Sequence, residues 1–189
     1  MAKPHERVFA LVTALLFLAS SIAVSALVVW QINEQKKTDE ISQAVNKAQE
    51  EQQQKEQNCT IGQADGTKEK VPAVFKPSGD VTKLETKDLE VGSGQEIKSG
   101  DCLIVKYHGT LAKDGKKFDG NFDTDKSLKF LFDKGQVIKG WDQGLAGMKV
   151  GGTRRIVIPS DLGYGEQATG SIPANADLVF VVKLVKIEQ

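Results

Sequence analysis

Histidine and cysteine are both scarce in this chain. Its 189 residues hold two of each, and the histidines, His5 and His108, lie in different segments. The cysteines, Cys59 and Cys102, form no C-x-x-C pair. A structural zinc site needs several such ligands at close spacing. The sequence therefore argues against a metal site, and it gives no indication of a cofactor.

An excess of charge of either sign is also missing. Lys and Arg together number 25, and so do Asp and Glu. The two signs balance on both sides of residue 80 as well. Proteins that bind the phosphates of DNA or RNA usually carry a basic excess. We therefore expect no nucleic-acid partner.

The N-terminal part contains a long run without charge, residues 8–30. As an α-helix this run would be about 34 Å long, which is enough to cross the hydrocarbon layer of a membrane. Lys3 and Arg7 precede the run and Trp30 closes it, a pattern that favours a cytoplasmic N-terminus and an anchor at the opposite interface. We expect residues 1–7 in the cytoplasm, a transmembrane anchor at 8–30 and an extracytoplasmic C-terminal part.

A cleavable signal segment is the alternative interpretation of the same run. Val24-Ser25-Ala26 has the small residues of a cleavage site. However, the run is longer than the roughly 7–15 apolar residues of a signal core. The prediction is a single-pass, membrane-anchored protein, with secretion after cleavage as the alternative. Either way the C-terminal part crosses the membrane.

Residues 31–80 are predicted to form a polar helical stalk followed by a linker. Gln, Glu and Lys dominate 31–57, where Ile41, Val45 and Ala48 form only a narrow apolar stripe on a helix. Such a stripe favours a solvated stalk over a short self-associating coil. Gly, Pro, Asp and Lys mark residues 58–80 as linker.

From residue 81 the pattern is that of a folded domain, 81–189. Alternating or continuous apolar residues predict strands at 102–108, 127–132, 154–159 and 178–187. Trp141, Leu145 and Met148 have the spacing of a helix over 139–148. Several short strands and one helix predict an α+β domain, with an antiparallel sheet folded around the helix.

Two motifs in this domain suggest a binding site. Val137-Ile138-Lys139-Gly140-Trp141 can place a buried tryptophan on the floor of a small apolar pocket. Leu162-Gly163-Tyr164-Gly165 holds a tyrosine in a glycine turn, where packing does not call for a large side chain. An apolar pocket suits a proline ring, and a tyrosine hydroxyl suits the carbonyl beside it.

With these motifs the domain resembles the FKBP-type peptidyl-prolyl isomerases. The resemblance keeps its order along residues 81–189, and residues 1–80 have no counterpart in the minimal family domain. It rests on six segments: Val105-Lys-Tyr-His-Gly109, Asp114-Gly-Lys-Lys-Phe-Asp119, Gly135-Gln-Val-Ile-Lys-Gly-Trp141, Gly147-Met-Lys-Val-Gly151, Leu162-Gly-Tyr-Gly165 and Leu178-Val-Phe180.

The resemblance implies an antiparallel five-stranded sheet wrapped around one short helix, and a hydrophobic cleft. Catalytic roles are implied for Tyr107, Asp119 and Tyr164, with the Tyr164 hydroxyl donating to a substrate carbonyl. Trp141 would form the floor. The remaining substrate-binding residues would be Phe118, Leu128, Phe130, Val137, Ile138, Ile172 and Phe180, Ile172 also offering its backbone N–H.

Two positions depart from the common family pattern. Leu128 stands where many members have an aromatic wall residue, which makes the cleft less aromatic. Leu162 stands where some members have a second tyrosine, which leaves the role of Tyr164 intact. We expect macrolides of the FK506 and rapamycin type to bind, with affinity weakened by Leu128.

The predicted function is isomerisation of X–Pro bonds in exported or extracytoplasmic proteins. The chemistry needs no nucleophile, metal or general base, only an apolar cleft that binds the twisted amide better than the planar one. Proline-containing polypeptides are the expected partners. The alternative is a non-catalytic chaperone or peptide-binding module that uses the same cleft.

The two cysteines leave one question open. An extracytoplasmic domain would allow a disulfide between Cys59 and Cys102. Such a bond would fix the linker to the sheet. The sequence cannot supply the Cα separation that the bond requires.

Overall fold

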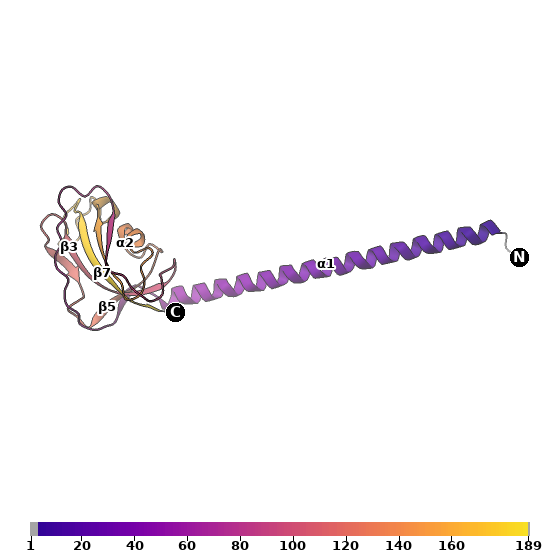
Figure 1. Cartoon of the computed structure of the whole chain (residues 1–189), viewed down its shortest axis with the longest axis horizontal. Coiled ribbons are helices and arrows are strands. Elements are labelled where there is room, and N and C mark those ends of the chain that lie inside the picture. Colours follow the sequence, from indigo (N-terminus) through magenta and orange to yellow (C-terminus); the bar gives the residue numbers. More distant parts are fainter. Residues whose placement is uncertain (1–3, 189) are drawn as a thin grey trace. The chain divides into compact units, whose positions relative to one another are not determined.

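The computed structural model describes the backbone of residues 4–188 and the side chains of residues 28–54 and 56–188. The chain divides into two compact units, Met1–Glu51 and Gln52–Gln189. Helix α1 (Pro4–Asn58) makes up the first unit, and its last residues, 52–58, belong to the second unit. Figure 1 shows α1 as one continuous helix. Ile41, Val45 and Ala48, the members of the predicted narrow stripe, are exposed.

No helix long and apolar enough to cross a membrane is found in the described part of the chain. The predicted anchor at 8–30 falls mostly outside that part, because only its last three side chains, 28–30, are described.

The second unit contains a seven-stranded antiparallel sheet in the order β1-β5-β3-β7-β6-β2, with β4 paired to β3. The central strands β3 and β7 share a ten-residue register. Both are buried along most of their length. The strands are β1 (Gly62–Asp65), β2 (Glu85–Glu90), β3 (Cys102–Leu111), β4 (Lys117–Gly120), β5 (Lys126–Leu131), β6 (Thr153–Ile158) and β7 (Leu178–Glu188).

The sheet therefore has more strands than the five that were predicted. The strands that apolar alternation did not predict are β1, β2 and β4, which are short or exposed and contain few apolar residues. Backbone pairing with a better-buried neighbour defines each of them: β5 for β1, β6 for β2 and β3 for β4. The predicted linker at 58–80 thus contains a strand of the sheet.

Helix α2 (Lys139–Gly144) is shorter than the predicted 139–148. The chain turns after Leu145, and Gly147 adopts a positive φ of 74°, a conformation that a helix cannot contain. The helix lies very close to β6. A methyl group on Gly140 or Gly144 would meet Ile158 or Ile156 at 2.5 and 2.7 Å, respectively. Glycine is therefore required at both positions, and Trp141 is held between them.

The main hydrophobic core lies between α2 and the sheet. It includes Leu103 and Val105 of β3, Phe130 of β5, and Phe180 and Val182 of β7. A short 3-10 helix, η1 (Ser160–Leu162), follows β6 and leads into the segment that carries Tyr164.

Lys106 of β3 is buried even though it is charged. Its ammonium group donates hydrogen bonds to the backbone carbonyls of Asn121, Thr124 and Lys126, at 3.2, 2.9 and 2.7 Å. Three acceptors satisfy all three donors of a lysine. The side chain thereby holds the turn between β4 and β5 against the sheet.

Candidate functional site: an aromatic cleft

A hollow of about 350 Å³ opens beside α2, at the edge of the main core. Strands β3, β4 and β7, helix α2, the loop before α2 and the segment after η1 all contribute to it. Its lining consists of Ile61, Tyr107, Phe118, Asp119, Gln136, Val137, Ile138, Trp141, Tyr164 and Phe180.

Trp141 forms the floor of this cleft. Its ring is buried, and it contacts Tyr107 and Phe180 edge-on, with ring centroids 5.4 and 5.2 Å apart. Phe130 lies 5.6 Å from the same ring. Such aromatic pairs each contribute about 0.5–1.5 kcal/mol beyond the burial of their area. These contacts therefore stabilise the Trp141 ring at the floor of the cleft.

Phe118 closes one side of the cleft. Its ring packs edge-on against Phe180, with centroids 5.4 Å apart. This packing depends on Gly109 of β3, because a methyl group there would meet the Phe118 and Phe180 rings at 2.7 and 2.8 Å. Strand β3 thus presents Tyr107 to the cleft and, two residues later, leaves room for an aromatic wall.

Tyr107 and Asp119 form a hydrogen-bonded pair at the cleft. The Tyr107 hydroxyl donates to Asp119 Oδ2 at 2.7 Å, and Asp119 Oδ1 accepts the backbone N–H of Gly120 at 2.7 Å. The backbone N–H of Tyr107 donates to Asn121 Oδ1 at 2.7 Å. Burial, followed by the hydrogen bond and charge of Asp119, raises the pKa of Tyr107 far above its usual value. Tyr107 is therefore a neutral phenol whose proton is directed at Asp119.

Tyr164 lies across the cleft with a different environment. It is 37% exposed, and its hydroxyl has no hydrogen-bond partner among the described side chains and backbone. Burial, and then the nearby charge of Asp119, raises the pKa of Tyr164. Gly165 has a positive φ of 61°, and its N–H donates to the Ser160 carbonyl at 2.8 Å, which closes the turn. Tyr164 thus offers to the hollow a protonated hydroxyl that is uncommitted among the described residues.

Eight of the eleven predicted site residues line the cleft together: Tyr107, Phe118, Asp119, Val137, Ile138, Trp141, Tyr164 and Phe180. The other three do not. Phe130 is fully buried against Trp141 and supports the floor from below. Leu128 is half-buried and packs against the main core.

Ile172 also lies outside the lining, in contrast to the prediction. Its side chain is buried in the main core. Its backbone N–H, predicted to be offered to a substrate, donates to the Thr169 carbonyl at 2.9 Å. The small bridge between Thr169 and Ile172 uses that donor within the loop.

Two lining residues were not predicted. Gln136 lies inside one of the motifs that carried the resemblance, and its position next to Val137 was the signal that could have identified it. Its Oε1 accepts the backbone N–H of Leu131 at 2.8 Å. Ile61 lies in the predicted linker, where nothing in the local sequence indicates contact with the cleft.

Among the described residues, the lining of the cleft contains no array of groups for covalent or metal chemistry. Within the described residues, no group of three or more His, Cys, Asp and Glu side chains could hold a metal ion. What the site provides is apolar surface, one carboxylate paired to a phenol, and one free phenol.

An α+β domain with a preformed aromatic cleft and a free hydroxyl at its edge defines a binding domain for a small apolar ring with a neighbouring hydrogen-bond acceptor. Comparison with known proteins gives the family. The family described as FKBP-type peptidyl-prolyl cis-trans isomerase matches residues 93–185. FK506-binding protein 2 of Aspergillus fumigatus is 45% identical over 98 residues, which cover 52% of this chain and 73% of that protein. The chain belongs to the FKBP-type peptidyl-prolyl cis-trans isomerases.

Longer relatives and solved structures agree with this assignment. FK506-binding protein 4 of Gibberella zeae is 50% identical over 101 residues, covering 53% of this chain and 20% of the relative. The chain spans under a third of the length of several such relatives. The crystal structure of AtFKBP13 has a TM-score of 0.52 and 34% identity, covering 56% of this chain and 93% of that one. FkpA from Escherichia coli has a TM-score of 0.52 and 40% identity, with coverages of 57% and 49%.

Proposed function

We propose that this chain is a peptidyl-prolyl cis-trans isomerase that acts on X–Pro bonds through the aromatic cleft. One observation carries the proposal: the uncommitted Tyr164 hydroxyl lies on the lining of an apolar hollow whose floor is Trp141. The proline ring packs on the Trp141 floor, and Tyr164 donates a hydrogen bond to a carbonyl of the bound peptide.

The cleft lowers the rotational barrier by binding the twisted amide more tightly than the planar one. The barrier of about 18–20 kcal/mol comes from amide resonance, which places partial charge on nitrogen and oxygen. Water stabilises that charge separation, so moving the amide into an apolar cleft weakens the preference for the planar form. Every ~1.4 kcal/mol of preference for the twisted form raises the rate about tenfold.

The Tyr107–Asp119 hydrogen bond fixes the only carboxylate among the described residues that line the cleft. Asp119 is held by two donors, the Tyr107 hydroxyl and the Gly120 N–H. The carboxylate is therefore fixed in one orientation at the lining of the cleft. We propose that its negative charge contributes to recognition of the twisted state.

A protease-coupled assay on short X–Pro peptides tests the proposal with the full chain. We expect acceleration over the uncatalysed rate, and a loss of rate in both Tyr164→Phe and Trp141→Ala. A rate equal to background from folded protein would exclude the activity. Wild-type rates in both variants would show that the catalytic cleft has been placed wrongly.

A non-catalytic chaperone or peptide-binding module is the second candidate, and Leu128 favours it. A leucine at this position makes the neighbourhood of the cleft less aromatic. Under this alternative, a Tyr164→Phe variant without isomerase activity would suppress aggregation of an unfolded client as well as the wild type. A parallel loss of both activities would support the isomerase.

Macrolides of the FK506 and rapamycin type are the proposed small-molecule ligands. Leu128 lies outside the lining and packs against the main core, so it would weaken binding through its neighbours in the core, and Leu128→Phe is expected to tighten binding. Titration calorimetry with both proteins measures the change, and equal affinities would contradict the role given to Leu128.

We further propose that the chain acts on exported or extracytoplasmic proteins. The uncharged run at 8–30 supports a membrane anchor, with 31–80 as stalk and linker and 81–189 as the isomerase domain. The disulfide between Cys59 and Cys102 is consistent with an oxidising compartment. Secretion after cleavage near Ala26 is the alternative, and it gives the same compartment for the domain.

A further inference from the structure

A segment that precedes the family domain reaches the cleft. The family match begins at residue 93, yet Ile61 is one of the residues that line the hollow. Ile61 is 52% exposed, so a large apolar side chain lies open to solvent at the cleft. Burial of that exposed surface by a ligand would be favourable.

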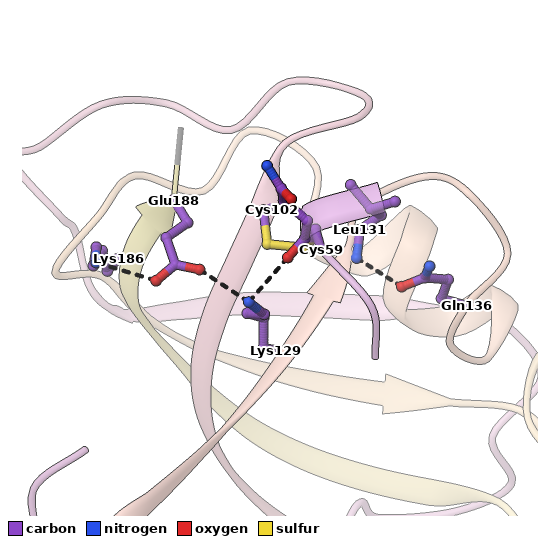
Figure 2. The surroundings of a disulfide bond; sticks show 8 residues. Cys59, Cys102, Lys129, Leu131, Gln136, Lys186 and Glu188 are labelled. Atoms are coloured by element: carbon purple, nitrogen blue, oxygen red, sulfur yellow. Dashed lines mark hydrogen bonds and ion pairs between the residues drawn. A yellow bond between two sulfur atoms is a disulfide. The ribbon is translucent and has the colours of Figure 1, made fainter. Parts of the chain in front are cut away.

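Ile61 is fixed on both sides along the chain. Two residues before it, Cys59 forms a disulfide with Cys102, the first residue of β3, with the Cα atoms 5.8 Å apart (Figure 2). Immediately after it, β1 (Gly62–Asp65) pairs with β5 over four residues. An ion pair of 2.7 Å between Asp65 and Lys126 closes the far end of β1. The position of Ile61 is therefore set by the sheet.

The disulfide is also connected to the cleft from the other side. Cys59, Cys102 and Leu131 form a small buried cluster. The backbone N–H of Leu131 donates to Gln136, which lines the cleft, and Figure 2 shows this bond beside the disulfide. Lys129 of β5 donates to the Asn58 carbonyl and to Glu188, each at 3.2 Å. Leu131 thus links the disulfide, which it contacts, to Gln136 in the lining of the cleft.

We propose that Ile61 is a specificity-determining residue of the cleft, which contacts an apolar side chain flanking the proline of the bound peptide. The Cys59–Cys102 disulfide and β1 are the elements that position it. This inference rests on the proposed isomerase function. It assigns to a segment outside the family domain a preference for apolar over charged neighbours of proline.

The experiment compares Ile61→Ala with the wild-type full chain on matched peptides. Leu, Ala or Glu is placed before the proline in one series and after it in another, and exchange is followed by NMR without a coupling protease. We expect kcat/KM for the preferred Leu peptide to fall about three- to tenfold through KM, and that for the Glu peptide to change less than twofold. Ile61→Val should keep most of the preference.

Ile41→Ala is the matched control, since it makes the same substitution at an exposed isoleucine of α1 that does not line the cleft. An unchanged Leu-to-Glu ratio in an active Ile61→Ala protein would overturn the inference. Absence of catalysis on every peptide by the wild type would instead remove the proposed function. The two failures are thus distinguishable.

The variant Cys59→Ala with Cys102→Ala tests the positioning role. With Ile61 retained, we expect the preference for Leu to fall toward that of Ile61→Ala. A full preference without the disulfide would show that β1 alone positions Ile61, and would overturn this part of the proposal.

Discussion

Trp141 lies on the floor of the cleft because the residues on either side of it in α2 allow the helix to approach the sheet. A Cβ atom on Gly140 or Gly144 would approach Ile158 or Ile156 more closely than side chains allow. At the same scale, the two tyrosines of the cleft differ in their hydrogen bonding. The Tyr107 hydroxyl is committed to Asp119, and the Tyr164 hydroxyl is not.

This difference predicts that removing the Tyr164 hydroxyl lowers activity, whereas removing the Tyr107 hydroxyl lowers stability. Tyr164→Phe removes no internal bond, so thermal stability should stay within about 0.5 kcal/mol of wild type while kcat/KM falls about tenfold, the value of one hydrogen bond. Tyr107→Phe leaves Asp119 without its donor and should cost about 1–2 kcal/mol of stability. Denaturant unfolding and peptide isomerisation, measured on both variants, check the pair. Equal destabilisation by the two changes would contradict the assigned bonding.

His108 predicts a pH dependence of stability. The side chain is buried in β3, and no hydrogen-bond partner for its Nε2 is found among the described residues. Burial, and then the charge of Lys117, lowers the pKa of His108 below its usual 6.5. The unfolded chain therefore binds the proton more readily than the folded one, so stability is complete above about pH 6.5 and is lost as the pH falls through the lower folded pKa.

Thermal unfolding between pH 5 and pH 8 measures this effect. The unfolding midpoint should be flat above about pH 7 and should fall below it, and His108→Gln should flatten the slope between pH 5 and pH 6.5. An identical slope in the variant would assign the dependence to other groups.

At the scale of elements, the edge of the sheet is extended by a strand that precedes the family domain. Strand β1 has no apolar alternation, and it exists because β5 offers an open edge and the disulfide brings the chain alongside it. This arrangement covers an edge that would otherwise be available for unwanted pairing. It also brings Ile61 to the cleft.

The disulfide should make a large contribution to the stability of the domain. It closes a loop with a sequence separation of 43 residues, for which the chain-entropy estimate is about 4 kcal/mol. Replacing both cysteines by alanine should therefore lower the melting temperature by about 10 °C. Differential scanning calorimetry of the two proteins measures the change. A shift below about 2 °C would mean that β1 and its contacts already restrain the chain without the bond.

At the scale of the whole molecule, the family domain occupies about half of the chain. The match covers residues 93–185, while the helical part up to Asn58 and the segment that follows it lie outside the match. The uncharged run at 8–30 is the feature expected to decide where the domain works.

Membrane fractionation in a cell expressing the full chain checks the proposed anchor. The protein should remain with the membranes after a wash at high salt, and deletion of residues 8–30 should release it. N-terminal sequencing of the mature protein distinguishes the anchor from a cleaved signal, because cleavage would leave a new N-terminus near residue 27. Release of the intact chain by salt alone would contradict the anchor.

The family, the α+β class and most of the cleft were predicted from the sequence because they depend on residues with strong local preferences. Long apolar strands identify β3 and β7, and a glycine turn marks where Tyr164 lies. The motif Gly135-Gln-Val-Ile-Lys-Gly-Trp141 contributes four lining residues from one stretch of chain, and three of them, Val137, Ile138 and Trp141, were predicted.

What the sequence could not provide were the contacts between segments far apart in the chain. Strands β1, β2 and β4 contain too few apolar residues to be distinguished from loops, and they form because a neighbouring strand offers backbone partners. The use of the Ile172 N–H within its own loop, the disulfide and the place of Ile61 in the cleft also depend on distances across the fold. The sequence by itself determined which residues are apolar, aromatic or free to turn. Only the tertiary structure decided which of them meet, because backbone pairing and cross-links join positions that the linear order separates.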